Sequence, residues 1–238
     1  MTAPPRTLKA RALGRARRAA RDVALVRHLP ARQLHRRLED LTLLPPAQFV
    51  DNLLVARRAR GVEGDLVECG AWRGGMSAAL AWQLPGRRSV LLDSFEGLPD
   101  AREIDGPAAV RWSTVIRDHE NCTADETWAH DAMARVGQTD YRLVKGWFDD
   151  TVPALAAEGR PIAVLRLDGD WYDSTIVCLE HLFPLVAEGG VVIIDDYFDW
   201  DGCCRAVHDH LSRTSSPDRL RTSGADEFAY IVKGAGPS

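Results

Sequence analysis

Four short apolar runs, each followed by an acidic or glycine-containing turn, constrain the fold of this chain more than any other feature. They cover residues 65–69, 89–93, 162–168 and 191–195. Continuous apolar runs of this length are typical of strands that are buried on both faces of a parallel sheet. Helical patterns lie between the runs, for example at residues 76–83 and 174–186. This alternation predicts a doubly wound α/β sheet.

Two further regions extend the predicted sheet. A fifth strand is expected at residues 141–145, and residues 219–222 and 228–232 suggest an antiparallel hairpin at one edge. Between Asp93 and Tyr141 the chain spends 47 residues, which is longer than a compact connection between neighbouring strands requires. We therefore expect a helix and a mobile lid in an insertion at about residues 100–140.

The N-terminal segment differs from the rest of the chain in charge. Residues 1–37 hold ten Arg and one Lys against the single Asp22, so the other 201 residues carry a net charge of −14. Prolines divide this segment into short helices, and residues 48–60 fit one more. We expect a basic helical extension over residues 1–60 and one further domain over residues 61–238. The positive charge of the extension could attract nucleic acid, an anionic membrane or an acidic partner. The favoured interpretation is that the extension forms solvated amphipathic helices.

The composition limits the class of protein. With 238 residues, of which 45% are hydrophobic and 27% charged, the chain is typical of soluble globular proteins. No apolar stretch approaches the roughly 18 residues of a membrane span, and the N-terminus has no secretory pattern. We expect a cytoplasmic protein with no membrane or nucleic-acid partner. The five cysteines form no C-x-x-C motif, so we expect reduced, structural thiols, with a redox switch at Cys203–Cys204 as the alternative.

A glycine-rich turn follows the first predicted strand. The segment from Glu68 to Ser77 contains Gly70 and Gly74 in a G-x-x-x-G-G spacing. Glycine allows close approach of a ligand to the backbone, and free N–H groups at a helix start favour an acceptor group. Glu68 suits a cofactor with a cationic amino-acid end. The G-x-G-x-x-G turn of a dinucleotide-binding oxidoreductase is absent, which makes that class a weak rival.

Asp93 ends the second strand, 23 positions after Gly70. In this topology an acidic residue there reaches the two hydroxyls of an adenosine ribose. The turn from Ser94 to Pro99, with Gly97 inside it, would lie beside the nucleoside. The alternative is that Asp93 caps the following helix.

Three carboxylates follow two strands that should be neighbours. Asp168 ends one strand, and Asp195 and Asp196 end the other. They should converge on the sheet edge where open α/β sheets bind ligands. A cluster of oxygen ligands without His or Cys favours a hard cation, Mg²⁺ first, with Ca²⁺ or Mn²⁺ as alternatives. The other interpretation is that they cap helices and pair with Arg166 or Arg205.

Together these segments resemble the macrocin O-methyltransferase (TylF/MycF-type) family of natural-product sugar methyltransferases. The resemblance covers about residues 45–233. It is carried by GDLVECGAWRGGMS, LLDSFEGLP, VKGWFDDTVP, LRLDGDWYDST and GGVVIIDDY. It implies a class I, Rossmann-like methyltransferase fold of seven strands with the last one antiparallel. It also implies S-adenosylmethionine as methyl donor, Mg²⁺ as metal and a homo-oligomer.

The resemblance also assigns site residues. Its metal site falls on Asp168, Asp195 and Asp196. Its cofactor site falls on Glu68, Gly70, Ser77, Asp93, Ser94, Gly97 and, near the adenine, Trp147.

The implied reaction is methylation of a (deoxy)sugar hydroxyl on a glycosylated secondary metabolite, as in antibiotic tailoring. A catechol- or phenol-type metal-dependent O-methyltransferase is the alternative. A sugar hydroxyl must lose its proton as it is methylated. Asp168 is the predicted base, with His119 of the lid as a competitor. Residues 102–138 depart from the family pattern, so the identity of the acceptor molecule is left undetermined.

Overall fold

A single seven-stranded sheet organises the molecule. The computed structural model describes residues 28–116, 122–224 and 227–234. The strand order is β3-β2-β1-β4-β5-β7-β6. The strands are β1 (Asp65–Cys69), β2 (Ser89–Asp93), β3 (Tyr141–Lys145), β4 (Ile162–Leu167), β5 (Val186–Ile194), β6 (Arg221–Thr222) and β7 (Ala229–Val232). The α/β class and the predicted strands are confirmed.

The strand order reverses between β1 and β4. Strands β1 to β5 run parallel, and β7, the last strand, pairs with β5 in the antiparallel direction. The chain moves outward from β1 to β3 and returns to β4, which lies beside β1. Ligands of open α/β sheets bind at such a switch point, outside the carboxyl ends of the strands. The topology therefore places the turns after β1 and β4 at a binding edge.

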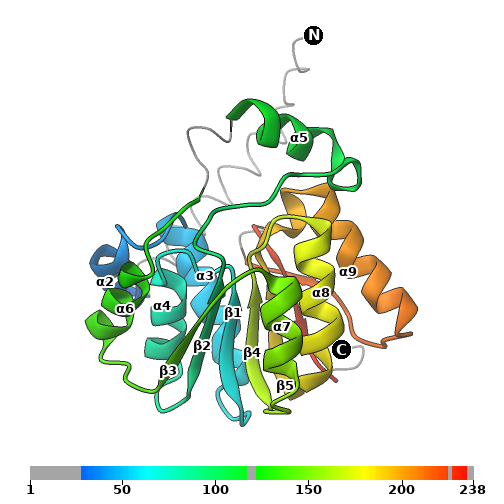
Figure 1. Cartoon of the computed structure of the whole chain (residues 1–238). Helices are drawn as coiled ribbons and strands as arrows, with labels where there is room; N and C mark the ends of the chain where they lie inside the picture. Colours follow the sequence, from blue (N-terminus) through cyan, green and yellow to red (C-terminus); the bar gives the residue numbers. More distant parts are fainter. Residues whose placement is uncertain (1–27, 117–121, 225–226, 235–238) are drawn as a thin grey trace, which may run out of the picture.

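Helices cover both faces of the sheet (Figure 1). One face carries α2, α3, α4 and α6, and the other carries α7, α8 and α9. Their bounds are α2 (Leu29–Leu38), α3 (Pro46–Ala56), α4 (Gly75–Gln83), α6 (Thr127–Val136), α7 (Phe148–Ala156), α8 (Tyr172–Leu182) and α9 (Asp201–Arg213). Along each central strand, alternate side chains enter the two apolar layers, as the uninterrupted apolar runs require.

One predicted boundary is wrong. The helix expected at residues 174–186 is present as α8 and a 3-10 helix that continues it to Leu185, but β5 begins at Val186 rather than at residue 191. Gly189 has φ +78° and Gly190 would bring a Cβ to 2.7 Å from the carbonyl oxygen of Ala187. The two glycines let the polar first half of β5 follow an irregular register beside β4, which an apolar pattern does not reveal.

The insertion after β2 has two parts. Residues 103–116, including α5 (Gly106–Arg111), lie above the carboxyl edge of the sheet (Figure 1). The second part ends in α6, whose Ala129 and Ala132 are buried against α4. Of the described residues of the insertion, the first part has the position of a lid, and its predicted mobility stays a prediction.

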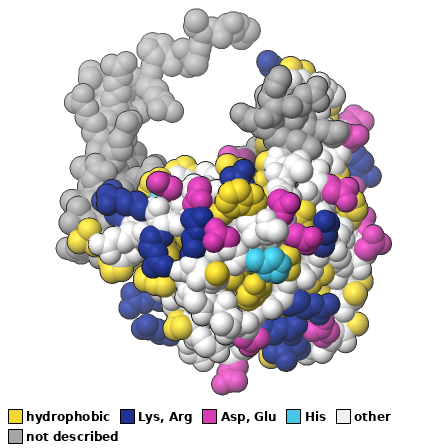
Figure 2. All heavy atoms as spheres, turned by 60° about the vertical axis from the view of Figure 1, so that its left-hand side comes forward, with side chains coloured by type: hydrophobic (Ala, Val, Ile, Leu, Met, Phe, Trp, Pro, Cys, Tyr) yellow, Lys and Arg dark blue, Asp and Glu magenta, His cyan; other side chains and the backbone are white. Residues whose placement is uncertain are grey.

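The N-terminal segment contributes to the core. Leu34 and Leu38 of α2 and Phe49 of α3 are buried in the same apolar layer as α4. On this side of the molecule basic and acidic side chains are interspersed (Figure 2). The helices predicted before residue 28 lie outside the described residues. Across residues 28–116, 122–224 and 227–234, no helix combines the length and apolar character needed to cross a membrane.

The five cysteines are thiols rather than disulfides. Cys69, Cys178 and Cys203 are buried, and Cys122 and Cys204 are partly buried. Burial raises the pKa of Cys203 well above its ordinary value. A thiolate is the reactive form of cysteine, so Cys203 has the character of a structural residue.

His210 of α9 predicts a dependence of stability on pH. Its side chain is buried against Phe183, and within the described residues neither ring nitrogen has a hydrogen-bond partner. Burial lowers the pKa of His210 below its ordinary value of 6.5. The unfolded chain binds a proton at a higher pH than the native protein does. The contribution of His210 to stability is therefore complete above about pH 6.5 and is lost as the pH falls.

We expect His210→Leu to flatten the loss of unfolding free energy between pH 7 and pH 5. The difference in slope should be at most about 1.4 kcal/mol per pH unit, the value for one proton. Urea denaturation at several pH values measures it. His181→Leu, an exposed histidine of α8, is the matched control and should keep the wild-type slope. Parallel curves for wild type and His210→Leu would contradict the assignment.

Candidate functional site

A cavity of about 510 Å³ opens at the carboxyl edge of the sheet. The turns that follow β1 to β5 line it, together with residues 97–100 after β2 and residues 43–45 before α3. Most of the sequence-predicted site residues meet here. These are Gly70, Asp93, Ser94, Gly97, Trp147, Asp168, Asp195 and Asp196.

The glycine-rich turn brings β1 against β4. Gly70 has φ +92°, and a Cβ built on it would lie 1.7 Å from the carbonyl oxygen of Asp168. Gly70 is therefore required by the contact between two backbones as well as by its place in the cavity wall. At the start of α4, the expectation of free backbone N–H groups is wrong for two residues. Gly74 donates to the carbonyl of Ala71, and Gly75 donates to that of Leu41.

Gly70→Ala is expected to lower the free energy of unfolding by about 2–5 kcal/mol. The estimate adds the cost of a left-handed conformation to that of overpacking against a backbone that cannot move aside. Urea denaturation measures the change. Gly86→Ala is the matched control, because Gly86 has φ +80° but no atom within 4 Å of the added Cβ. An equal effect of the two substitutions would contradict the packing explanation.

Asp93 stabilises the turn between two ligand-facing segments. Its Oδ2 accepts the N–H of Trp72 at 2.7 Å, and its Oδ1 accepts the N–H of Phe95 at 2.7 Å. No helix starts directly after Asp93, so it does not act as the helix cap that was the alternative. Burial raises the pKa of Asp93. Both oxygens keep a fixed direction beside the cavity.

The segment after Asp93 forms the predicted turn. The Ser94 hydroxyl donates to the carbonyl oxygen of Gly97 at 3.1 Å and accepts the N–H of Glu96. Gly97 has φ +91°, a conformation that favours glycine. Trp147 follows the neighbouring strand β3 and precedes α7. It is 40% exposed, which leaves its ring available to a planar group.

Glu68 and Ser77 lie behind the cavity wall. Both are buried, and the Ser77 hydroxyl donates to Glu68 Oε2. The other oxygen of Glu68 accepts from Arg166 at 2.7 Å. Burial raises the pKa of Glu68 to about 7, although Arg166 and Ser77 oppose the shift. These two residues therefore support the turn from below, and their predicted contact with a cofactor stays a prediction.

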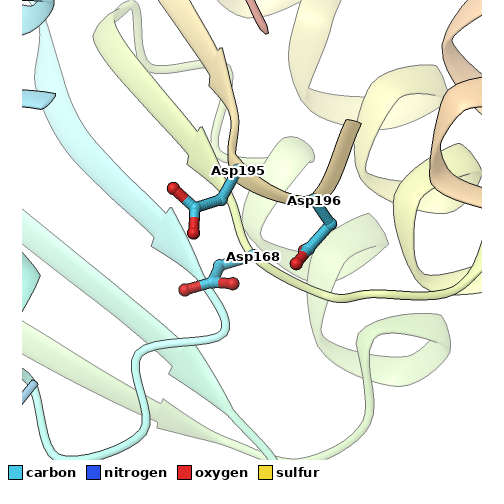
Figure 3. Close-up of side chains that lie close together, drawn as sticks. All are labelled: Asp168, Asp195 and Asp196. Carbon is cyan, nitrogen blue, oxygen red and sulfur yellow. The ribbon is translucent and has the colours of Figure 1, made fainter. Parts of the chain in front are cut away.

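Asp168, Asp195 and Asp196 converge at the ends of β4 and β5 (Figure 3). Each offers one oxygen, and these three oxygens lie within 4.8 Å of one another. Asp195 and Asp196 are buried, whereas Asp168 is partly exposed to the cavity. Burial raises the pKa of Asp195 to about 6, against the opposing effect of Arg166. Burial, and then the charges of Asp170 and its other neighbours, raises the pKa of Asp196 well above its ordinary value.

Part of the alternative interpretation of this cluster is also realised. The Arg166 guanidinium lies 2.6 Å from Asp168 Oδ2 and 2.9 Å from Asp195 Oδ1. Arg205, the other proposed partner, is exposed on α9. One arginine thus faces Glu68, Asp168 and Asp195 at once, and Asp196 adds a further acidic group. The cluster keeps an excess of negative charge that a divalent cation would balance.

The cluster fits a hard metal ion in its chemistry. Every predicted ligand is a carboxylate, which is the donor type that Mg²⁺ prefers. Arg166 compensates Asp195 Oδ1 at 2.9 Å, but this one guanidinium is shared with Glu68 and Asp168. Buried carboxylates in excess of the available positive charge are costly unless a further cation compensates them. The residues present therefore fit the predicted magnesium ion.

Asp170 is a site residue that the sequence analysis did not select. It lines the cavity with φ +58°, an unusual conformation for a residue other than glycine. Its Oδ1 accepts from Trp200 Nε1 at 2.8 Å, and its own N–H donates to Asp196 Oδ2 at 3.0 Å. Burial raises its pKa to about 7. The D-G-D spacing after β4 is the sequence signal for Asp170, but of its two aspartates only Asp168 is assigned a role from the sequence.

The segment around α3 also reaches the site. Leu43, Leu44 and Pro45 form an apolar part of the cavity wall. Gln48 of α3 lies 3.5 Å from Asp195 Oδ2, and Asn52 accepts from Arg166 Nε at 3.2 Å. Helical periodicity predicted α3 but gave no indication that its polar side chains meet the acidic cluster.

Comparison with known proteins identifies the relatives of this chain. The family model for macrocin O-methyltransferase (TylF) matches residues 47–222. A 4'-O-methyltransferase of Streptomyces olivaceus, named for 8-demethyl-8-(2,3-dimethoxy-alpha-L-rhamnosyl)-tetracenomycin C, is 42% identical over 68% of this chain. The demethyldecarbamoylnovobiocin O-methyltransferase of Streptomyces niveus is 36% identical over 69%. The matches cover 63% and 64% of these relatives, slightly under two thirds of their length.

A solved structure agrees with this result. The O-methyltransferase NovP superposes with a TM-score of 0.69 and 28% identity, over 81% of this chain and 82% of NovP.

Proposed function

The chain belongs to the macrocin O-methyltransferase (TylF) family, and on that premise we propose that it is an S-adenosylmethionine-dependent O-methyltransferase. Its proposed acceptor is a (deoxy)sugar hydroxyl on a glycosylated secondary metabolite, as in antibiotic tailoring. One observation carries the proposal. A single cavity at the switch point joins the turns of Gly70 and Asp93 to an acidic cluster. A methyl donor and a hydroxyl acceptor could thus lie next to each other.

The wall formed by β1 to β3 suits the methyl donor. Asp93 is fixed by two backbone N–H groups and would accept hydrogen bonds from the ribose hydroxyls. Trp147 supplies an aromatic ring at the rim for the adenine, and Gly97 keeps the adjacent turn tight. These residues would orient the donor.

The wall formed by β4 and β5 suits the metal and the acceptor. Asp168, Asp195 and Asp196 would hold Mg²⁺, which when bound orients adjacent sugar oxygens and lowers the pKa of the hydroxyl to be methylated. The cavity wall around these carboxylates would then position the acceptor hydroxyl for in-line attack on the methyl group of the donor. Positioning of this kind can supply roughly 7–11 kcal/mol of the reduction in barrier.

A carboxylate must accept the proton of the acceptor hydroxyl. Asp168, the base predicted from the sequence, is held by Arg166 and is also a predicted metal ligand. Asp170 faces the same cavity without contacting a basic side chain in any described part of the chain, so we add it as the stronger base candidate. His119, the competitor from the lid, lies outside the described residues.

The choice of a sugar acceptor draws on the relatives. The Streptomyces olivaceus enzyme is named for a rhamnosyl tetracenomycin. A catechol- or phenol-type acceptor is the alternative, since two adjacent phenolic oxygens could use the same carboxylates and cation. The homo-oligomeric state and the cytoplasmic location stay predictions from the sequence.

Transfer of a labelled methyl group from S-adenosylmethionine tests the proposal. We expect label in rhamnosylated antibiotic acceptors with Mg²⁺ present, and its loss when EDTA replaces Mg²⁺. Matched reactions with catechol acceptors decide between the two acceptor classes, and reactions without acceptor give the background. Equal labelling with and without the chelator would refute the metal requirement, and labelling of catechols alone would refute the sugar acceptor.

A further inference from the structure

Arg166 lies in a buried cluster of charged side chains behind the cavity. Its side chain is only 1% exposed, because it belongs to the central strand β4, and such a buried position is unusual for an arginine. The register places Arg166 opposite Glu68 of β1 and Ile193 of β5, and Asp195 follows Ile193 by two residues. Side chains two apart on a strand share a face. Glu68, Arg166 and Asp195 therefore point to the face of the sheet that α3 covers.

Each nitrogen of the guanidinium has its own role. Nε donates to Asn52 Oδ1 at 3.2 Å. Nη1 donates to Glu68 Oε1 at 2.7 Å and to Asp168 Oδ2 at 2.6 Å. Nη2 lies 2.9 Å from Asp195 Oδ1. Arginine is thus in contact with one defined oxygen of each neighbouring carboxylate.

The second oxygens of the same aspartates are less engaged. Asp195 Oδ2 lies at a long distance of 3.5 Å from Gln48 Nε2, and the Asn52 side chain also contacts the Asp195 carboxylate. For Asp168 Oδ1, the described part of the chain shows no hydrogen bond. Fixing one oxygen of a carboxylate fixes the direction of the other, because the group is planar and rigid.

We propose that Arg166 is a positioning residue for the metal site, holding one oxygen of Asp168 and one of Asp195 so that the remaining oxygens face a divalent cation. This inference rests on the proposed function, in which those aspartates are metal ligands. Arg166 itself does not belong to the lining of the cavity, so it is assigned no contact with the cation or the acceptor. Groups that orient metal ligands from behind typically change metal affinity 10- to 100-fold when they are lost.

Lysine separates the geometric role of Arg166 from its charge. Removing the positive charge alone would favour cation binding, which opposes the effect of lost orientation. Lysine keeps the charge but replaces a planar fork of five donors by one compact ammonium group. An ammonium group cannot maintain the contacts with Asn52, Glu68, Asp168 and Asp195 together. Arg166→Lys therefore reports on orientation.

Binding of Mn²⁺ to the full chain tests the proposal without turnover. The free Mn²⁺ signal in electron paramagnetic resonance gives the affinity, and calorimetry with S-adenosylhomocysteine in EDTA shows whether the cofactor wall is intact. We expect Arg166→Lys to raise the Kd for Mn²⁺ at least about tenfold and to leave cofactor affinity within about threefold. Arg160→Lys is the matched control, because Arg160 is half-exposed and pairs with Asp65 at the other end of β4. It should bind Mn²⁺ like wild type.

Two results would overturn the inference. Wild-type Mn²⁺ binding with an unchanged Kd in Arg166→Lys would refute the role of Arg166 and leave the proposed function standing. Absence of Mn²⁺ binding by the wild type would refute both the role and the metal requirement. If Arg166→Lys does not fold, Asn52→Ala takes its place, since it removes the partner of Nε without changing any charge. Asn52 also contacts Asp195, so Gln48→Ala, which removes a contact of Asp195 but none of Arg166, is the control for Asn52→Ala. Asn52→Ala should raise the Kd for Mn²⁺ several-fold, and an unchanged Kd would again refute the role.

Discussion

Asp195→Asn is expected to reduce methyl transfer at least about a thousandfold, which corresponds to roughly 4 kcal/mol of lost transition-state stabilisation. Asn replaces a charged metal ligand with a neutral one of the same shape, so the site loses affinity for Mg²⁺ and the acceptor loses its orientation. The same substitution should leave S-adenosylhomocysteine binding within about threefold, because the predicted cofactor contacts lie on the other wall of the cavity.

Two measurements check this prediction. Initial rates with labelled S-adenosylmethionine give the change in turnover, and calorimetry gives the cofactor affinity of the same sample. Asp131→Asn, on the surface of α6, removes one acidic charge away from the cavity and should behave like wild type. A rate for Asp195→Asn within tenfold of wild type would contradict the assignment of Asp195 as a metal ligand.

Asp170→Asn is expected to lower turnover by about 10²–10⁴-fold, the usual contribution of a general base. The amide can still accept from Trp200, so the local structure should be kept. Mn²⁺ binding should also be kept, because Asp170 is outside the predicted ligand set. Asp168→Asn provides the comparison. It should lose both turnover and Mn²⁺ binding, since Asp168 is a predicted metal ligand. Near-normal turnover of Asp170→Asn would return the base role to Asp168 or His119.

The sequence predicted the sheet well for a physical reason. Strands β1, β2 and β3 match their expected ranges. For β1 and β2 the reason is burial on both faces, which requires a largely apolar strand, whereas β3 is a partly exposed edge strand. The convergence of Asp168 with Asp195 and Asp196 followed from the same topology, because parallel strands end at one edge. The start of β5 was missed where Gly189 and Gly190 replace apolar residues.

Long-range contacts account for what the sequence did not show. The carbonyl oxygen of Leu41 accepts the N–H of Gly75, and Asn52 accepts from Arg166, across 34 and 114 positions of the chain. Periodicity identifies a helix but not its polar partners. Glu68 lies behind the cavity wall because its cross-strand neighbour is Arg166. An arginine inside the apolar run of β4 was the sequence signal for such a pair. Of the two arginines proposed as partners of the acidic cluster, Arg166 contacts it, whereas Arg205 is exposed on α9.

The central claim is that one cavity holds the methyl donor on its first wall and the metal with the acceptor on its second. Calorimetric titration of S-adenosylhomocysteine into the protein, once with Mg²⁺ and once with EDTA, tests it most directly. The account predicts micromolar binding in both conditions, because Asp93 and Gly70 act without the metal. Absence of binding in both conditions would contradict the assignment of the Gly70 turn and with it the proposed methyltransferase activity.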